Sequence, residues 1–197
     1  MLSNEAEKLD PRVKRTRQMI EQAFMNLVDE KGFQAISVQD VTERAGLNRA
    51  TFYAHFPDKY ALLDYSIQQR FRQEIEQRML NACHFTNENL RILILTVCEF
   101  VADTHGHCAL TEPQFQALVE TQVRAQVYGL LNHWLENLPL IQNTRISRER
   151  AATAASWAIY GLATDWSRNK RQPPLEQYAD EVLPLVAANL GLTIEMA

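Results

Sequence analysis

The chain has 197 residues, of which 46% are hydrophobic and 22% charged, so its composition is that of a globular protein and excludes a disordered one. Only 6 glycines and 7 prolines are present, too few for a turn-rich all-β protein. The net charge is -4, yet residues 1–60 hold nine basic and nine acidic side chains, with a basic cluster at Arg12, Lys14, Arg15 and Arg17. The first third of the chain is thus neutral overall but basic locally. Because phosphate binding depends on local charge, an acidic protein of this kind can still present a DNA-binding unit.

The first predicted element is an amphipathic helix over residues 12–31. Its apolar side chains recur at helical spacing, at Ile20, Phe24, Leu27 and Val28. Lys31 in the last turn, followed by Gly32, is typical of a helix C-terminus. Residues 1–11 are expected to form a flexible arm in front of this helix.

Two short helices are predicted next, separated by a tight turn. Ser37 and Asp40 have the spacing of a capping box, which opens the first of them, and Gly46 ends it. Asn48 can cap the second helix, in which Phe52 and Phe56 lie one turn apart. A pair of short helices joined in this way has the outline of a helix-turn-helix.

The rest of the chain also has helical periodicity. Pro57 and Asp58 end the third helix, and a long charged helix with one apolar stripe is predicted over 59–81. Residues 82–89 are expected to form a loop, and further helices are predicted over 90–104, 113–138, 147–168 and 174–190. No alternating strand pattern of convincing length is present, so the predicted fold is all-α.

The third predicted helix carries side chains suited to the DNA major groove. Arg49 matches guanine O6 and N7, and the methyl groups of Ala50 and Thr51 suit the thymine methyl. Tyr53 and His55 follow on the side expected to be exposed. These residue types therefore favour base contacts at the start of the helix.

Phosphate contacts are expected beside it. Lys59 stands in the first turn of the next helix, where a cation and free backbone N–H groups can hold one phosphate. Lys14 and Arg15 add phosphate neutralisation or a reach into the minor groove. The alternative is that Tyr53, His55 and Lys59 are only solvated and that the helix pair serves packing.

The same residues carry a resemblance to a known family. Its motifs are Ile36-Ser37-Val38, Val41-Thr42, Ala45-Gly46-Leu47, Leu62-Leu63 and the block Thr51-Phe52-Tyr53-Ala54-His55-Phe56-Pro57-Asp58-Lys59, preceded by a helix ending in Lys31-Gly32-Phe33. Over about residues 12–65 the chain resembles the N-terminal domain of the TetR/AcrR family of transcriptional regulators. The family usually has Ser at the position of Asn48, which caps equally well. With this resemblance the DNA-binding positions are Lys14, Arg15, Ser37, Gln39, Asn48, Arg49, Ala50, Thr51, Tyr53, His55 and Lys59.

The resemblance also implies an organisation and a mechanism. Residues 12–58 would form a three-helix DNA-binding domain, and 59–197 a helical ligand-binding and dimerisation domain joined to it by the long helix. The implied function is that of a repressor, which binds a palindromic operator as a homodimer and is released by a small molecule. Two copies are needed because one short helix reads too few bases, and half-sites lie about 34–36 Å apart.

A dimer surface is expected on the last two helices. Small and apolar residues line one face of each, and paired across a two-fold axis they would form a four-helix bundle. The residues are Ala151, Ala155, Ala158, Leu162, Trp166, Leu175, Tyr178, Val182, Leu185 and Val186. The alternative is that both stripes pack inside one subunit.

The candidate effector pocket is defined by aromatic side chains of the C-terminal region. They combine apolar surface with phenol and indole hydrogen-bonding groups. They are Phe100, Phe115, Tyr128, Trp134, Trp157 and Tyr160. Each could equally be a core residue, because aromatic side chains at helical spacing are more often core than pocket.

Other chemistry has little support. The segment His105-Gly106-His107-Cys108, with Cys83, His84 or His133, suggests a metal, but the spacing of a structural zinc site is missing, so no metal and no cofactor are expected.

Three cysteines imply no disulfide framework, and the N-terminus lacks the apolar core of a secretory signal, so a cytoplasmic protein is expected. No catalytic motif argues for an enzyme. The alternative function is a DNA-bound partner-recruiting or architectural protein without a small-molecule inducer.

Overall fold

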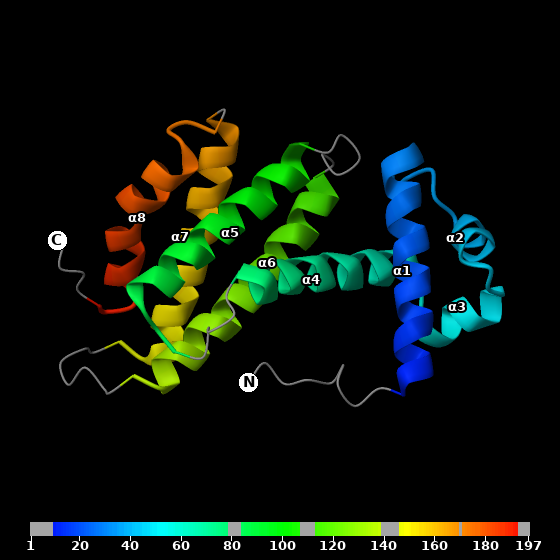
Figure 1. Cartoon of the computed structure of the whole chain (residues 1–197), viewed down its shortest axis with the longest axis horizontal. Coiled ribbons are helices and arrows are strands. Elements are labelled where there is room, and N and C mark those ends of the chain that lie inside the picture. The colour runs from blue at the N-terminus through cyan, green and yellow to red at the C-terminus, as the bar shows by residue number, and fades with distance from the viewer. Residues whose placement is uncertain (1–9, 79–83, 107–112, 139–145, 170, 193–197) are drawn as a thin grey trace.

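The regular structure of the protein is helical, as predicted. The computed structural model describes residues 10–78, 84–106, 113–138, 146–169 and 171–192, and every regular element in these ranges is an α-helix. The helices are α1 (Pro11–Lys31), α2 (Val38–Ala45), α3 (Arg49–His55), α4 (Lys59–Arg78), α5 (Asn87–Gly106), α6 (Pro113–Glu136), α7 (Arg148–Arg168) and α8 (Leu175–Asn189). Figure 1 shows α1, α2 and α3 gathered at one end of α4 and α5 to α8 at its other end.

The first three helices begin and end where local hydrogen bonds satisfy their backbones. The Asp10 carboxylate accepts from the backbone N–H of Arg12 at 2.8 Å and caps α1. Ser37 and Asp40 form the predicted capping box of α2, and Gly46 ends that helix in the left-handed region at φ 66°. A side chain is strained at such a φ, which explains the glycine.

One expectation about the helix boundaries is wrong. Helix α5 begins at Asn87, inside the stretch 82–89 that was expected to be a loop. The Thr86 hydroxyl accepts from the backbone N–H of Asn89 at 2.9 Å and so supplies an N-cap. The apolar periodicity begins only at Leu90, which is buried, so the polar first turn carries no periodic signal.

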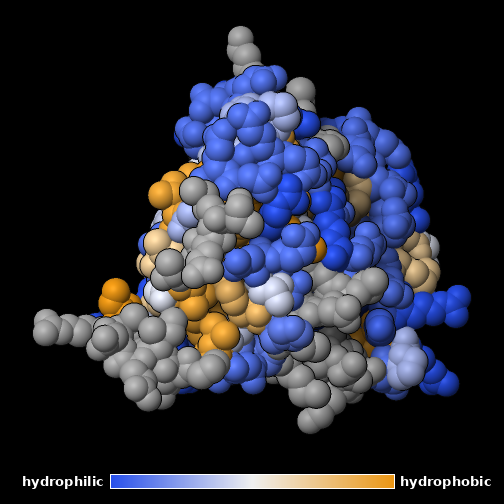
Figure 2. Space-filling model, turned by 60° about the vertical axis from the view of Figure 1, so that its left-hand side comes forward, coloured by the Kyte–Doolittle hydropathy of each residue, from blue (hydrophilic) through white to orange (hydrophobic). Residues whose placement is uncertain are grey.

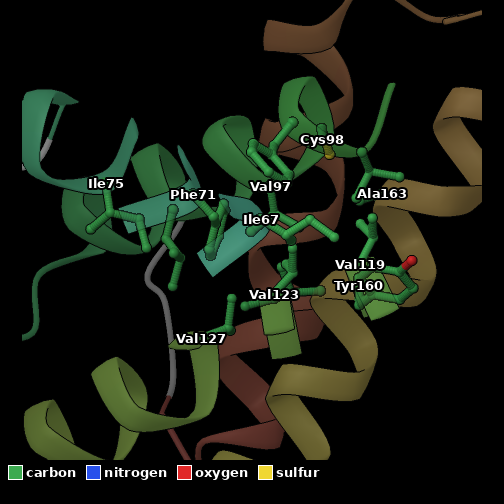
Figure 3. Packing of buried hydrophobic residues seen from close by; sticks show 14 of the residues in the cluster. Ile67, Phe71, Ile75, Val97, Cys98, Val119, Val123, Val127, Tyr160 and Ala163 are labelled. Atoms are coloured by element: carbon green, nitrogen blue, oxygen red, sulfur yellow. The ribbon is translucent and has the colours of Figure 1, made fainter. Parts of the chain in front are cut away.

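The core of the C-terminal half is made by α4, α5, α6 and α7. In Figure 3, Phe71 of α4, Val97 of α5 and Val123 of α6 gather around Ile67 of α4, and Tyr160 of α7 lies beside Val119 of α6; all of these side chains are buried. Each such side chain contributes about 1.5–3 kcal/mol through its removal from water. The shared core joins the far end of α4 to the other three helices.

No helix in the described part of the chain is both long and apolar enough to cross a membrane.

Candidate nucleic-acid interface

The start of α3 presents polar side chains to solvent on a firmly capped helix. Arg49 and Ala50 are exposed, and Asn48 caps the helix, its Oδ1 accepting from the backbone N–H of Thr51 at 2.7 Å. The Thr51 hydroxyl donates to the same oxygen at 3.0 Å. Phe52 on the opposite face is fully buried. The structure therefore brings Arg49 and Ala50 together at the surface, while the Thr51 hydroxyl is occupied by the cap.

The aromatic residues of α3 divide between surface and core as the spacing predicts. Tyr53 is 50% exposed, and Phe52 and Phe56 are buried. His55 is half-buried, and burial, with a smaller contribution from the charge of Arg17, lowers its pKa. His55 is therefore neutral near pH 7 and can offer a hydrogen bond without a charge.

Helix α2 contributes a second exposed edge. Gln39 is exposed, and its amide donates to the Glu43 carboxylate at 2.8 Å. The Ser37 hydroxyl donates to Asp40 Oδ2 at 2.6 Å within the capping box, so this hydroxyl is occupied. Lys14 and Arg15 are exposed on the first turns of α1.

Two ion pairs join α1 to α2. The guanidinium of Arg44 donates to both carboxylate oxygens of Glu30, each at 2.7 Å, and its hydrogen bond lowers the pKa of Glu30. Lys31 pairs with Asp40 at 2.9 Å. Hydrogen bonds from Ser37 and then from Lys31 hold the pKa of Asp40 well below its usual range. Both carboxylates therefore remain charged at neutral pH.

Arg17, which was not among the expected site residues, packs against aromatic rings beside α3. Its guanidinium lies 5.7 Å from the ring centroid of Phe56 and 5.6 Å from that of Tyr65. These cation–π contacts join α1 to the end of α3 and to α4. The basic cluster in the sequence was a signal for this residue, but it indicated a solvent-facing cation.

At the start of α4, the structure differs from the arrangement predicted for a phosphate site. Lys59 is half-buried, and its ammonium donates to backbone carbonyls of the turn between α1 and α2 instead of facing solvent. The carboxylate of Asp58 accepts from the backbone N–H groups of Tyr60 and Ala61, each at 2.8 Å. The cation and the N–H groups proposed for a phosphate are thus already bound within the protein.

This geometry agrees with the comparisons with known proteins. Residues 20–65 match the family model of bacterial regulatory proteins, tetR family. Residues 20–65 are therefore similar to the N-terminal part of regulators of the tetR family. HTH-type transcriptional regulator YxbF of Bacillus subtilis is 38% identical over 69 residues, which cover 34% of this chain and 18% of the relative. An HTH-type transcriptional regulator of Staphylococcus aureus is 31% identical over 96 residues, which cover 47% of this chain and 52% of the relative.

The chain thus spans at most about half the length of these curated relatives. By their names, these relatives are transcriptional regulators. This agrees with the lack of catalytic motifs in the sequence.

Solved structures show that the likeness of fold extends over most of the chain. FadR from Bacillus subtilis in complex with stearoyl-CoA has a TM-score of 0.58 at 18% identity and covers 87% of this chain and 98% of its own. Thermus thermophilus FadR in complex with lauroyl-CoA has a TM-score of 0.58 at 21% identity, with coverages of 92% and 97%. The Flavonoid-responsive Regulator FrrA has a TM-score of 0.59 at 18% identity, with coverages of 88% and 96%. At these identities the comparison shows the fold alone.

The six aromatic residues suggested for an effector pocket do not come together. Phe115 packs against Phe33, at the turn between α1 and α2, whereas Trp157 is 51% exposed on α7. The remaining four are Trp134, Phe100 and Tyr160, which are buried, and Tyr128, which is half-buried. Burial in the core therefore explains most of this set, because large apolar rings at helical spacing face neighbouring helices.

A surface pocket of about 380 Å³ between α6 and α7 does include one of them. It is lined by Thr121, Arg124, Ala125, Tyr128, Thr153 and Ser156. The Arg124 guanidinium lies 3.4 Å from the ring centroid of Trp157, beside this pocket. An exposed aromatic ring stacked on a cation is a composition typical of protein interfaces.

Six of the ten residues expected at a dimer surface are instead in the core of the subunit. They are Ala151, Ala155, Trp166, Tyr178, Val182 and Val186. The physical reason is that α7 packs against α5, α6 and α8 together, so its small-residue stripe faces neighbours in its own chain. The hydroxyl of Tyr178 donates to the carbonyl of Leu162 at 2.9 Å, which closes α8 onto α7.

The other four of these ten residues lie nearer the surface. Leu185 is 61% exposed on α8, and Ala158, Leu162 and Leu175 are half-buried. In Figure 2, which brings the side of the molecule with α8 forward, apolar side chains gather in the lower part of the face and polar ones in the upper part.

The histidine and cysteine residues indicate no metal centre in the part of the chain that the structure describes, where no three potential ligands group together. Cys83, His107 and Cys108 and the side chain of His105 lie outside the described residues. Cys98 is buried, and burial raises the pKa of its thiol to about 12. This thiol therefore stays protonated and unreactive at neutral pH.

Proposed function

We propose that the chain is a ligand-responsive transcriptional repressor, which binds a palindromic DNA site as a homodimer and is released by a small molecule. The observation that carries the proposal is the exposed pair Arg49 and Ala50 on a helix that is capped by Asn48 and fixed to the core by Phe52. A rigid helix with an exposed, cationic first turn is what major-groove reading requires.

We propose that the two ends of α4 join two parts of the chain with different functions. Residues 12–58 form the DNA-binding domain, with Lys14, Arg15, Gln39 and Tyr53 as further DNA contacts. Residues 59–197 bind the effector and the second subunit. Because α4 packs both on α1 and on α5 and α6, a displacement of α4 would change the orientation of the DNA-binding domain.

The proposed dimer surface lies on α7 and α8, on the side chains that remain exposed. Trp157 and Leu185 are the two large apolar side chains exposed on the described parts of these helices. Exposed aromatic and aliphatic groups of this size are candidate anchors of an interface. The proposed dimer uses the same two helices as expected; Leu185 belongs to the expected set, and Trp157 is added to it.

The proposed effector class is an amphipathic molecule with a long apolar part. The support is the likeness of fold to regulators solved with stearoyl-CoA and with lauroyl-CoA. The core between α4 and α7 is largely apolar, and Tyr160 adds a phenol at its edge. Acyl-CoA thioesters are therefore the first class to test, with flavonoids as a second class after FrrA.

The DNA-binding part is tested by selecting duplexes from random DNA with the purified full chain at near-physiological salt. An enriched inverted repeat with half-sites one helical turn apart supports a dimeric, sequence-specific regulator. Salt-sensitive binding without an enriched sequence would overturn the assignment, because phosphate contacts alone carry no sequence information.

The effector part is tested with acyl-CoA thioesters of 8 to 18 carbons, free CoA as the matched control, and one flavonoid series. A true effector raises the melting temperature, since it binds only the folded state, and lowers affinity for the selected duplex. If none of these compounds does both, the acyl-CoA and flavonoid classes are wrong for this chain. A regulator that recruits a protein partner would then become the better proposal.

A further inference from the structure

The guanidinium of Arg17 in α1 lies against two aromatic rings that belong to other parts of the chain. It is 5.7 Å from the ring centroid of Phe56, the residue that ends α3, and 5.6 Å from that of Tyr65 in α4. The two rings also contact each other, with centroids 5.3 Å apart. These distances are typical of cation–π and aromatic pairs. We call these three side chains the Arg17 stack.

The surroundings of Arg17 differ from those of the cations that precede it. Arg12, Lys14 and Arg15 are exposed, whereas Arg17 is half-buried. Its Nε is shielded from solvent and has no hydrogen-bond partner among the described residues. A guanidinium is flat and more weakly hydrated than an ammonium, so ring faces can replace part of its water. Arg17 is therefore held within the protein by the rings.

The stack lies where the orientation of α3 is decided. The backbone N–H of Phe56 donates to the carbonyl of Phe52 at 2.9 Å, which ties Phe56 to the last turn of α3. Both rings are buried, with centroids 6.0 Å apart. Arg49 begins this helix, which is only seven residues long. A shift of Phe56 therefore changes the direction in which Arg49 points.

The charge of Arg17 also acts on His55, the neighbour of Phe56. Burial lowers the pKa of His55, and the charge of Arg17 lowers it further. The centroids of the His55 and Phe56 rings are 6.5 Å apart. A neutral side chain in place of Arg17 would therefore raise the pKa of His55, whereas another cation would not. The charge of Arg17 and its stacking can thus be measured separately.

Tyr65 connects the stack to the helix that joins the two parts of the chain. It is half-buried early in α4, and α4 also packs on α5 and α6. We propose that Arg17 is a positioning residue for DNA recognition, which holds the end of α3 against α4 through the rings of Phe56 and Tyr65. The inference rests on the proposed DNA binding, and it adds a route by which a displacement of α4 reaches α3.

The test compares affinities for the selected inverted repeat. Arg17→Lys keeps the charge but loses the flat guanidinium, and Arg17→Met removes the charge but keeps an apolar stem. Tyr65→Leu removes the ring of α4, and Tyr65→Phe keeps it. The matched controls are Arg15→Lys and Arg15→Met, because Arg15 is an exposed cation on the same helix.

We expect Arg17→Lys to weaken binding about three- to tenfold, which corresponds to the loss of one partly desolvated cation–π contact. Arg15→Lys should bind like the wild type, and Arg15→Met should bind more weakly, because the proposed role of Arg15 is its charge. Tyr65→Leu should cost about as much as Arg17→Lys, and Tyr65→Phe should retain binding. The double variant of Arg17→Lys and Tyr65→Leu should lose little more than either single variant.

Two results would overturn the proposal. One is wild-type affinity of Arg17→Lys, which would show that only the charge matters. The other is full additivity of Arg17→Lys and Tyr65→Leu, which would show that the two side chains act independently. Neither result depends on Arg17→Met, so the proposal stays falsifiable if that variant does not fold.

Titration of the His55 ring by NMR tests the placement of Arg17 without DNA. Arg17→Met should raise the pKa of His55, and Arg17→Lys should leave it low. An unchanged pKa in folded Arg17→Met would contradict a guanidinium beside the end of α3. If the wild type selects no duplex, the proposed function fails, and the role of Arg17 in recognition fails with it. If the wild type selects a duplex that Arg17→Lys binds equally well, only the stack is refuted.

Discussion

The ring of Phe115 packs edge-to-face on the ring of Phe33, with centroids 4.7 Å apart, so the start of α6 directly contacts the turn that precedes α2. Phe33 also contacts Tyr60 of α4 at 5.2 Å and lies under the Lys59 ammonium. This turn is therefore held both by the start of α6 and by the start of α4. A displacement of either helix acts on the segment that positions α2.

The aromatic contact predicts energetic coupling between the two domains. Phe33→Leu and Phe115→Leu should each destabilise the protein, and together by less than the sum, with a coupling of about 0.5–1.5 kcal/mol. Urea unfolding of the two single variants and the double variant measures this. Phe85→Leu is the matched control, because Phe85 contacts Trp134 at 6.1 Å, away from the DNA-binding helices. Full additivity of Phe33→Leu and Phe115→Leu would show that the rings do not interact.

The Phe115 contact also predicts an effect on DNA affinity. Phe115→Leu should weaken or strengthen binding of the selected duplex by at least a few fold, because it frees the turn before α2. Phe85→Leu, which alters a ring that does not contact this turn, should leave the affinity unchanged. The prediction fails if both variants bind DNA alike.

Base recognition is predicted to depend on Arg49. Arg49→Ala should cost about 1–3 kcal/mol of binding and relax the preference at one position of each half-site. Lys14→Ala should weaken binding to all sequences equally, because Lys14 is proposed to contact phosphate. A position-by-position affinity profile of both variants checks this, and an unchanged profile for Arg49→Ala would remove its role in base reading.

Because of Glu21 in α1, we expect the unfolding free energy of the protein to depend on pH. Glu21 lies in a groove between α1 and α4, and burial raises its pKa to about 7, opposed by the nearby Arg70. In the unfolded chain its pKa is near 4.5, so the proton is bound more tightly in the folded state. Its contribution to stability is therefore fully present below pH 4.5 and is lost as pH rises through 7.

The corresponding variant is Glu21→Gln, which keeps the shape and removes the titration. The unfolding free energy of Glu21→Gln should exceed that of the wild type. The difference should grow from pH 4.5 to 7 and then stay constant at about 1–2 kcal/mol, allowing for screening by solvent. Denaturant unfolding at pH 5, 6, 7 and 8 provides the measurement. A difference that does not change with pH would mean that Glu21 titrates normally.

The dimer surface predicts a fluorescence change on dilution. Of the three tryptophans, Trp134 and Trp166 are buried and Trp157 is 51% exposed, so an interface on α7 should shield Trp157 alone. Dilution should therefore shift the emission to the red, with a midpoint at the dimer dissociation constant. Leu185→Asp should move that midpoint to higher concentration, whereas Ile146→Asp, equally exposed but before α7, serves as the control. Emission that is independent of concentration while sedimentation shows dissociation would exclude Trp157 from the interface.

Local features of this protein follow directly from the sequence. The capping box of Ser37 and Asp40, the left-handed Gly46, the cap at Asn48 and the inward faces of Phe52 and Phe56 all depend on residues within about four positions of one another. Hydrogen bonds and side-chain periods at that range are set by residue type and spacing alone. The all-α fold and the helix-turn-helix outline could therefore be predicted.

Contacts between distant residues were decided by tertiary packing. Lys59 is a cation at the start of a helix in the sequence, but only the approach of the turn 26 residues earlier supplies the carbonyls that bind it. The stripe of small residues on α7 could pack on a partner subunit or on α5 and α6 of the same chain. In the structure it packs on α5 and α6. Phe115 likewise became a link to Phe33 and not a pocket residue. Periodicity shows which side chains leave water, but the partner that covers them depends on how the helices pack.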